Sequence, residues 1–134
     1  MADLYRLMER PPSVAEYRSL IRAVGWAEWT NVAAAEAALA RSLYHVVALH
    51  EEAVIGMARV VGDGAMFFYI QDVVVTPAYQ GRGVGTLLLE RVMDAAPEKA
   101  FIGLFAAEGK HPYYTRLGFA VEPLLTGMFR HAPL

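Results

Sequence analysis

The chain has 134 residues, the length of one domain with a single hydrophobic core spanning 1–134. Hydrophobic residues make up 56% and charged residues 19%, so the composition excludes a disordered chain. The net charge of -2 excludes nucleic-acid binding through a basic surface, and the absence of cysteine excludes disulfides, thiolate nucleophiles and cysteine-ligated metals.

Neither a targeting segment nor a membrane span is expected. Residues 1–13 carry charges throughout and lack the apolar stretch of a signal peptide. The longest charge-poor stretch, 65–78, contains Asp72 and Pro77 and is shorter than the roughly 18 apolar residues that span a bilayer. We therefore expect a cytoplasmic protein that does not insert into a membrane.

The N-terminal part of the chain predicts a short strand followed by two helices. Apolar and polar residues alternate over 4–7, before two prolines. Ser13 and Glu16 have the spacing of a capping box, and apolar residues then recur at helical intervals up to Gly25. A second helix, rich in alanine, is expected over 30–41.

After the second helix the hydrophobic period changes from 3.6 to 2, which is typical of strands. The β-branched runs 43–50 and 54–61 flank a short polar turn and predict a hairpin. A Gly-Asp-Gly turn then leads into a long strand, 66–75. Its later half is apolar on both faces, so we expect it at the centre of the sheet. Residues 84–96 predict a helix that Pro97 ends.

The C-terminal part predicts a buried strand over 101–106, a short helix over 112–117 that ends at Gly118, and two closing strands over 119–122 and 127–131. The complete order is β-α-α-β-β-β-α-β-α-β-β. A central strand that is followed by a helix and another strand implies one right-handed crossover. We therefore expect an α+β (mixed α/β) fold, with one parallel strand pair inside an otherwise antiparallel sheet.

A glycine-rich loop between the central strand and the next helix is the most informative segment. Gly81, Gly83 and Gly85 stand at alternate positions where the helix begins. Glycine allows positive φ angles and close approach of a ligand to the backbone. Successive N–H groups at a helix N-terminus attract a phosphate or pyrophosphate, and Arg82 and Thr86 add side-chain donors. We therefore interpret the loop as an anion site, the alternative being a purely structural turn.

Two nucleotide-binding motifs do not fit this loop. A Walker A loop ends in Gly-Lys-Ser/Thr, whereas Gly85-Thr86 has no lysine. The dinucleotide fingerprint requires a glycine where Thr86 stands and an acidic residue about twenty positions later, where the sequence is apolar. A Rossmann-type nucleotide-binding domain is therefore disfavoured.

Two motifs together resemble the GNAT superfamily of acyl-CoA-dependent N-acyltransferases. The run Gln80-x-x-Gly83-x-Gly85 is similar to the family's motif A, and segment 111–119, with Tyr114 four residues before Gly118, is similar to its late signature. With the order of elements, the resemblance extends from about residue 4 to residue 131. It implies a GNAT-like fold, with helices on both faces of a mostly antiparallel sheet, and acetyl-CoA as the co-substrate without a metal.

The resemblance also implies which residues hold coenzyme A. Main-chain N–H groups of the glycine loop would bind the pyrophosphate, and the backbone of the central strand would bind the pantetheine arm. The cofactor-binding residues expected on this basis are Val73, Val74, Val75, Gln80, Gly81, Arg82, Gly83, Val84, Gly85 and Thr86.

The implied reaction is direct attack of a neutral amine on a thioester, so a base must take a proton from the amine and an acid must supply one to the leaving thiolate. Tyr114 matches the family's general-acid tyrosine, the alternative being a buried core tyrosine. Asp72 is the only acid on the central strand and is either the base or a structural aspartate held by hydrogen bonds. Glu108 and His111 are further candidate bases.

The sequence departs from the family pattern at two positions. Ala107 stands where the family often has asparagine, and Lys110 stands where it often has a small residue. A contact of that asparagine to the pantetheine arm or to an ordered water is therefore missing, and Lys110 is a candidate to reach the phosphates instead.

The acceptor is expected at the connection between the first two helices. Trp26 and Trp29 would form an aromatic pocket with residues 67–69 of the central strand, and Glu28 would attract an amine. The alternative is that these large aromatic side chains belong to the core. We expect a small primary amine, such as an aralkylamine, ahead of a peptide or protein amine.

Two functions are compatible with these motifs. The first is an N-acetyltransferase, and the alternative is a non-catalytic module that binds or senses acyl-CoA. Tyr114 distinguishes them, because a binding module does not need an acid at that position. Exposed Met128 and Phe129 in the closing hairpin would support a homodimer, and no pair of histidines has the spacing of metal ligands.

Overall fold

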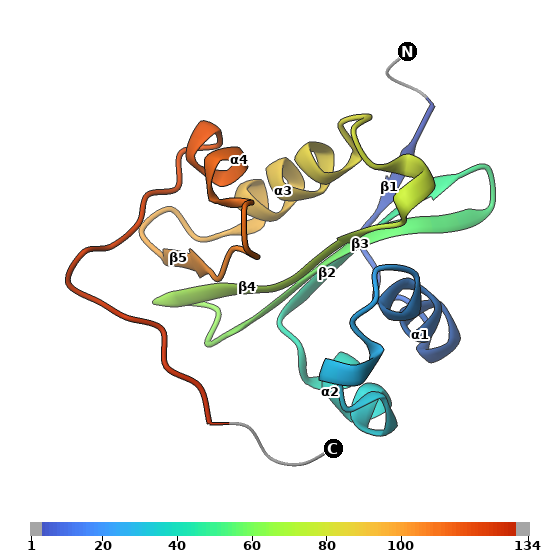
Figure 1. The fold of residues 1–134 in the computed structure, drawn as a ribbon, viewed down its shortest axis with the longest axis horizontal. Helices are drawn as coiled ribbons and strands as arrows, with labels where there is room; N and C mark the ends of the chain where they lie inside the picture. Colours follow the sequence, from blue (N-terminus) through green and yellow to red (C-terminus); the bar gives the residue numbers. More distant parts are fainter. Residues whose placement is uncertain (1–3, 131–134) are drawn as a thin grey trace. The chain divides into compact units, whose positions relative to one another are not determined.

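The computed structural model describes residues 4–130 (Figure 1). Within them, residues 4–103 form one compact unit and residues 104–130 a second. The strands are β1 (Arg6–Met8), β2 (Tyr44–His50), β3 (Ala53–Gly62), β4 (Phe67–Val75) and β5 (Phe101–Leu104). The helices are α1 (Val14–Ala23), α2 (Ala35–Arg41), α3 (Val84–Ala95) and α4 (His111–Arg116), with short 3-10 turns η1 (Ala27–Trp29), η2 (Val32–Ala34) and η3 (Pro77–Tyr79). No helix in this described part is long and apolar enough to cross a membrane.

The five strands form one sheet in the order β1-β2-β3-β4-β5. The pairs β1–β2, β2–β3 and β3–β4 are antiparallel, and the sheet as a whole is mixed. β2 and β3 form the predicted hairpin, in which Glu51 adopts a φ of 58°. Between the neighbouring strands β4 and β5 the chain passes through α3, which is the predicted crossover helix. The predicted fold class is therefore confirmed, while the prediction of a single domain stays a prediction.

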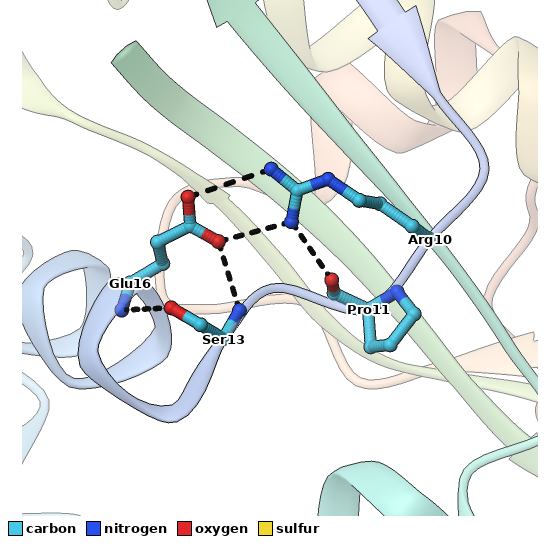
Figure 2. A network of polar contacts seen from close by, with 4 residues as sticks. All are labelled: Arg10, Pro11, Ser13 and Glu16. Carbon is cyan, nitrogen blue, oxygen red and sulfur yellow. Dashed lines mark hydrogen bonds and ion pairs between the residues drawn. The ribbon is translucent and has the colours of Figure 1, made fainter. Parts of the chain in front are cut away.

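The start of α1 is fixed by the predicted capping box and by an arginine that joins it. Ser13 Oγ accepts the N–H of Glu16 at 3.1 Å, and Glu16 Oε1 accepts the N–H of Ser13 at 2.8 Å. Figure 2 shows Arg10 reaching the same carboxylate, with Nη1 3.0 Å from Oε1 and also donating to the carbonyl of Pro11 at 2.9 Å. The hydrogen bond from Arg10 holds the pKa of Glu16 below its ordinary value.

Apolar side chains pack on both faces of the sheet. Figure 1 shows α1 and α2 on one face and α3 on the other. Leu20 and Ile21 of α1 and Leu39 of α2 pack on the first face, while Leu88 of α3 is fully buried on the second. At Gly56 of β3, an added β-carbon would lie 3.3 Å from Leu88 Cδ1. This close contact between α3 and β3 holds the N-terminus of α3 at the end of β4.

Two elements are shorter than predicted. The second helix is interrupted, because η2 precedes α2 and neither Asn31 nor Ala34 provides a side-chain cap. β5 ends at Leu104, two residues before the predicted end.

The prediction of two closing strands is wrong for the described residues. Residues 119–130 contain neither helix nor strand, and His131 lies outside the described residues. The Glu122 carboxylate accepts the N–H of Leu124 at 3.0 Å, and Pro123 between them has no N–H to donate to a ladder. Leu124 and Met128 are both 88% exposed. An apolar, β-branched pattern forms a strand only where another strand pairs with it.

Candidate active site

The loop between β4 and α3 presents bare backbone at the N-terminus of α3. Gly81 and Gly83 have φ angles of 75° and 84°, which side chains with a β-carbon disfavour. A β-carbon at either position would meet no atom within 4 Å, and the first turn of α3 contains no acidic residue. The N–H of Leu87 donates to Gly83 O at 3.1 Å, so the N–H groups of Val84 and Gly85 come before the first N–H that donates within the helix. This open, donor-rich loop fits a phosphate group.

Gln80 attaches the loop to the end of β4. Its Nε2 donates to Val75 O at 2.9 Å, and its backbone N–H donates to Pro77 O at 3.2 Å. These two contacts give Gln80 a function in shaping the loop, and its contact with a cofactor stays a prediction. Arg82 is exposed between the two left-handed glycines, and Thr86 is half-buried in the first turn of α3.

The end of β4 extends beyond the neighbouring strand β5. β4 has nine residues and β5 has four. The N–H of Phe101 donates to Met66 O at 2.7 Å, so the two strands meet at their N-terminal ends. The β4 segment Val73–Val75 pairs with β3 on its other side. A pantetheine arm would need backbone N–H and C=O groups that are not already paired with a strand. The edge of Val73–Val75 that lies beyond the end of β5 fits this predicted contact.

A cavity of about 280 Å³ lies between the α1–α2 connection and β4. It is lined by Trp26, Trp29, Thr30, Gln71 and Asp72. Trp26 packs partly against the core, whereas Trp29 is 76% exposed. The structure thus brings the two predicted tryptophans together. Glu28 is exposed on η1 and is not among the residues that line the cavity.

The predicted contribution of residues 67–69 to this pocket is not observed. Phe68 is 3% exposed and belongs to the core, and the ring of Phe67 packs against Phe101 with centroids 6.1 Å apart. Successive side chains of a strand point to opposite faces, so three consecutive aromatic residues cannot line one cavity.

Asp72 is held in a buried ion pair. Its Oδ2 accepts Arg59 Nε at 2.7 Å and the Tyr17 hydroxyl at 3.4 Å, whereas Oδ1 takes part in neither contact. The side chains of Arg59 and Asp72 are 11% and 8% exposed. Arg59 also donates to Ser42 Oγ at 3.1 Å, and burial raises the pKa of Tyr17. Of the two roles left open for Asp72, these contacts favour the structural one, and its role as a base stays a prediction.

Tyr114 lies in the second unit, on α4. Its ring makes edge-on contacts with Tyr113 at 5.2 Å and with Phe119 at 6.1 Å. Two residues after the helix ends at Arg116, Gly118 adopts a φ of 96°, and the N–H of Phe119 returns to Tyr114 O at 3.1 Å. Burial raises the pKa of Tyr114, so its hydroxyl stays protonated at neutral pH and remains a donor.

Sequence reasoning missed two groups of contacts. The side chain of His50, at the end of β2, has Nδ1 2.6 Å from the hydroxyl of Tyr79. Arg59 lies opposite Asp72 in the β3–β4 register. The signal that could have found it was a single arginine in the apolar run 54–61, which a buried position allows only with a charged partner. Over residues 4–130, no group of three or more His, Cys, Asp or Glu side chains is placed to hold a metal ion.

Known proteins resemble the chain over most of its length. A sequence model of the "Acetyltransferase (GNAT) family" matches residues 1–119. Histone acetyltransferase TAP1 of Glycine max is 32% identical over 131 residues, which cover 87% of this chain and 56% of that protein. Serotonin N-acetyltransferase 2, chloroplastic, of Oryza sativa subsp. japonica is 37% identical over 71 residues, which cover 52% of this chain and 36% of that protein. The chain thus spans about a third to just over half of the length of these curated relatives.

A solved structure shows the same similarity in three dimensions. The GNAT family acetyltransferase from Streptococcus pneumoniae superimposes with a TM-score of 0.84 at 30% identity, over 96% of this chain and 98% of that one. The family model and this structure each match far more than half of the chain. The chain belongs to the GNAT family of acetyltransferases.

Proposed function

We propose that the chain is an N-acetyltransferase that transfers the acetyl group of acetyl-CoA to a small primary amine. The observation that carries the proposal is the open glycine loop at the N-terminus of α3, with Gly81 and Gly83 in the left-handed region and no atom where their β-carbons would lie. N–H groups of the loop after Gln80, within residues 81–86, would hold the pyrophosphate, because the N–H of Gln80 itself already donates to Pro77 O. The backbone of Val73–Val75 would bind the pantetheine arm along the edge of β4 that extends past β5.

The cavity beside β4 supports a small amine as the acceptor. Its volume of about 280 Å³ is close to the lower end of the ~300–1,000 Å³ typical of small-molecule sites. Two indole rings provide faces that attract both aromatic groups and cations. Asp72 provides negative charge at the wall, and its Oδ1 is not used by Arg59 or Tyr17. A protonated aralkylamine therefore matches the chemistry of this cavity.

The two curated relatives are named for different acceptors. The Oryza protein is named for serotonin, an aralkylamine, and the Glycine protein is named for histones. A protein lysine would require a groove that accepts a peptide backbone, whereas Trp26, Trp29 and β4 line a cavity of small-molecule size. A small amine is therefore the first proposal, and a peptide or protein amine is the second.

The reaction needs an amine that has lost its proton and a donor for the thiolate. An alkylammonium with a pKa near 10.4 is neutral in roughly one molecule in a thousand at neutral pH. The neutral nitrogen forms a bond to the thioester carbonyl carbon, the C–S bond breaks, and the Tyr114 hydroxyl gives its proton to the leaving sulfur. The acylated nitrogen releases its surplus proton to a base or water chain, and the Tyr114 phenolate regains a proton from solvent, so that the net transfer is from nitrogen to sulfur. Burial raises the pKa of Tyr114, so the phenol carries the proton that this role requires at neutral pH.

Calorimetry and a thiol-release assay test the proposal together. Acetyl-CoA is expected to bind, and NAD and ATP are not. A panel of aralkylamines, alkylamines and a lysine peptide is then assayed for released thiol, with the aralkylamines expected to give the highest kcat/KM. Binding of acetyl-CoA without turnover of any amine would support the sensing module instead. Binding of NAD without acetyl-CoA would overturn both functions.

A matched pair of variants tests the acceptor cavity separately. Trp29→Ala is expected to raise KM for an aralkylamine and to leave KM for acetyl-CoA unchanged, because the exposed indole lines the acceptor cavity and is not part of the glycine loop. Trp29→Phe keeps an aromatic face and is expected to raise KM for the aralkylamine less than Trp29→Ala does. Equal KM values in all three proteins would place the acceptor elsewhere.

Association and location are further proposals. Met128 and Phe129 are 88% and 65% exposed, and these apolar side chains support a homodimer that sedimentation analysis would detect. A cytoplasmic location is proposed from the composition alone. The relative from Oryza is described as chloroplastic.

A further inference from the structure

Three aromatic side chains from distant parts of the chain meet beside the glycine loop. Tyr5 precedes β1, His50 ends β2, and Tyr79 ends η3. His50 Nδ1 lies 2.6 Å from the Tyr79 hydroxyl, and their ring centroids are 5.3 Å apart in an edge-on arrangement. The ring of Tyr5 contacts both, with centroids 5.9 Å from His50 and 6.0 Å from Tyr79. A short hydrogen bond and three edge-on contacts therefore fix the orientation of the Tyr79 ring.

The guanidinium of Arg82 lies over the ring of Tyr79. Its Cζ lies 5.6 Å from the centroid of Tyr79, within the range of a cation–π contact. Among residues 4–130, no acidic side chain forms an ion pair with Arg82. A guanidinium held in a cation–π contact with a fixed ring has fewer orientations open to it, which favours N–H groups placed for an anion. The backbone at Gly81 and Gly83 presents N–H groups from the same short segment.

We propose that Tyr79 and His50 are positioning residues, which hold the guanidinium of Arg82 where it binds a phosphate group of coenzyme A. The proposal rests on the proposed function, because it assigns a task to these side chains within acetyl-CoA binding. An exposed arginine loses rotamer freedom when it binds an anion. An arginine already in a cation–π contact with a fixed ring loses less of this freedom, so the same contact with phosphate gives a higher affinity.

The phosphate is either the pyrophosphate or the 3′-phosphate, and the two share the same chemistry of recognition. Bidentate arginine–phosphate contacts are charge-assisted and depend on the orientation of the guanidinium plane. Because of this dependence, the hydrogen bond between His50 and Tyr79 would influence the affinity for coenzyme A, although neither side chain contacts the phosphate. A merely structural role of these residues would change stability without changing the preference for phosphate groups.

Calorimetric titration of coenzyme A and 3′-dephospho-coenzyme A tests the proposal. Arg82→Gln is expected to weaken binding of coenzyme A about tenfold, the loss typical of one charge-assisted hydrogen bond. Tyr79→Leu is expected to weaken binding of coenzyme A by a similar factor. Tyr79→Phe keeps the aromatic ring and is expected to weaken it less. The double variant Arg82→Gln/Tyr79→Leu is expected to bind no more weakly than Arg82→Gln alone, because the ring acts through the arginine. KM for the amine acceptor should not change.

Control variants separate the proposal from general effects. Arg18→Gln removes an exposed arginine on α1 and is expected to leave affinity unchanged, which excludes net charge as the cause. His50→Leu should weaken binding, and His50→Asn, which keeps a hydrogen-bonding group near Nδ1, should restore part of it. If Tyr79→Leu does not fold, Tyr79→Phe and the two His50 variants still measure the positioning effect.

The two ligands distinguish the phosphate groups, and the variants distinguish the roles. A loss seen equally with both ligands assigns the pyrophosphate to Arg82, and a loss seen only with coenzyme A assigns the 3′-phosphate. Wild-type affinity of Arg82→Gln for both ligands would overturn this inference and leave the proposed function intact. Full additivity of Arg82→Gln and Tyr79→Leu would overturn the positioning role. A wild-type protein that binds neither ligand would overturn the proposed function and this inference together.

Discussion

Substitution of Asp72 by asparagine should destabilise the protein far more than the loss of a surface ion pair. Asparagine keeps the size of the side chain and removes its charge, which leaves Arg59 beside a neutral partner. The two side chains are 11% and 8% exposed, so solvent cannot replace the lost charge. Arg59 then retains the hydrogen bond to Ser42 at 3.1 Å and the Tyr17 ring at 5.8 Å. Removing one partner of a buried pair costs about 3–5 kcal/mol, a large share of the ~5–15 kcal/mol that stabilises a domain.

Urea denaturation of a mutant cycle measures this cost. Asp72→Asn and Arg59→Met are each expected to lower the free energy of unfolding by about 3 kcal/mol. The double variant Arg59→Met/Asp72→Asn removes both charges and should lose less than the sum of the two. Glu9→Gln breaks the exposed Glu9–Arg91 pair, 3.5 Å apart, and serves as the matched control with an expected loss of about 0–1 kcal/mol.

The same cycle decides between the two roles of Asp72. A loss below about 1 kcal/mol in Asp72→Asn would refute the reasoning, because the pair would then behave like one at the surface. Full stability combined with a collapse of kcat would identify Asp72 as the catalytic base. Loss of stability, with the activity of the folded fraction retained, would identify it as structural.

Three further substitutions test the loop, the acid and the helix cap. Tyr114→Phe should lower kcat and leave acetyl-CoA affinity nearly unchanged, and single-turnover kinetics with unchanged rates would contradict the acid role. Gly83→Val should weaken coenzyme A binding by more than tenfold, because a branched side chain enters the space of the phosphate. Gly25→Val, at another open position with a φ of 78°, is the control for backbone strain, and calorimetry should show unchanged affinity. Glu16→Gln should lower the free energy of unfolding by about 1 kcal/mol at pH 7. The folded pKa of Glu16 lies below its ordinary 4.5, so its stabilisation is present above that value and lost as the pH falls through the folded pKa. The two unfolding curves should therefore converge at acid pH, and a constant difference down to about pH 2 would count against the ionic contribution.

Features coded within a few residues were predictable from the sequence. The Ser13–Glu16 box fixes the start of α1, because both hydrogen bonds are local. Gly81 and Gly83 adopt positive φ angles, which the glycine spacing suggested, whereas Gly85 lies within α3. The change of the hydrophobic period from 3.6 to 2 predicted β2 and β3, and each predicted end lies within one residue of the observed end.

Features that depend on register or on a partner strand were not predictable. His50 and Tyr79 are 29 residues apart and Arg59 and Asp72 are 13 apart, so only the folded sheet brings each pair together. The segments 119–122 and 127–131 were predicted to be strands, and neither is one within the described residues. An apolar side-chain pattern favours a strand, but a strand also needs backbone hydrogen bonds to a neighbouring strand, and the local sequence does not show whether one is present.

The residues that line the cavity differ in how much a substitution would affect the stability of the fold. Asp72 serves the core through its ion pair with Arg59 and the acceptor cavity through its position in the wall, so a change there alters stability and acceptor binding together. Trp26 is similarly constrained, because part of its ring packs on the core cluster. Trp29 is 76% exposed, and its replacement removes little buried surface from the folded state. Within the described cavity, Trp29 is therefore the position at which the preference for one amine over another can change with the least effect on folding.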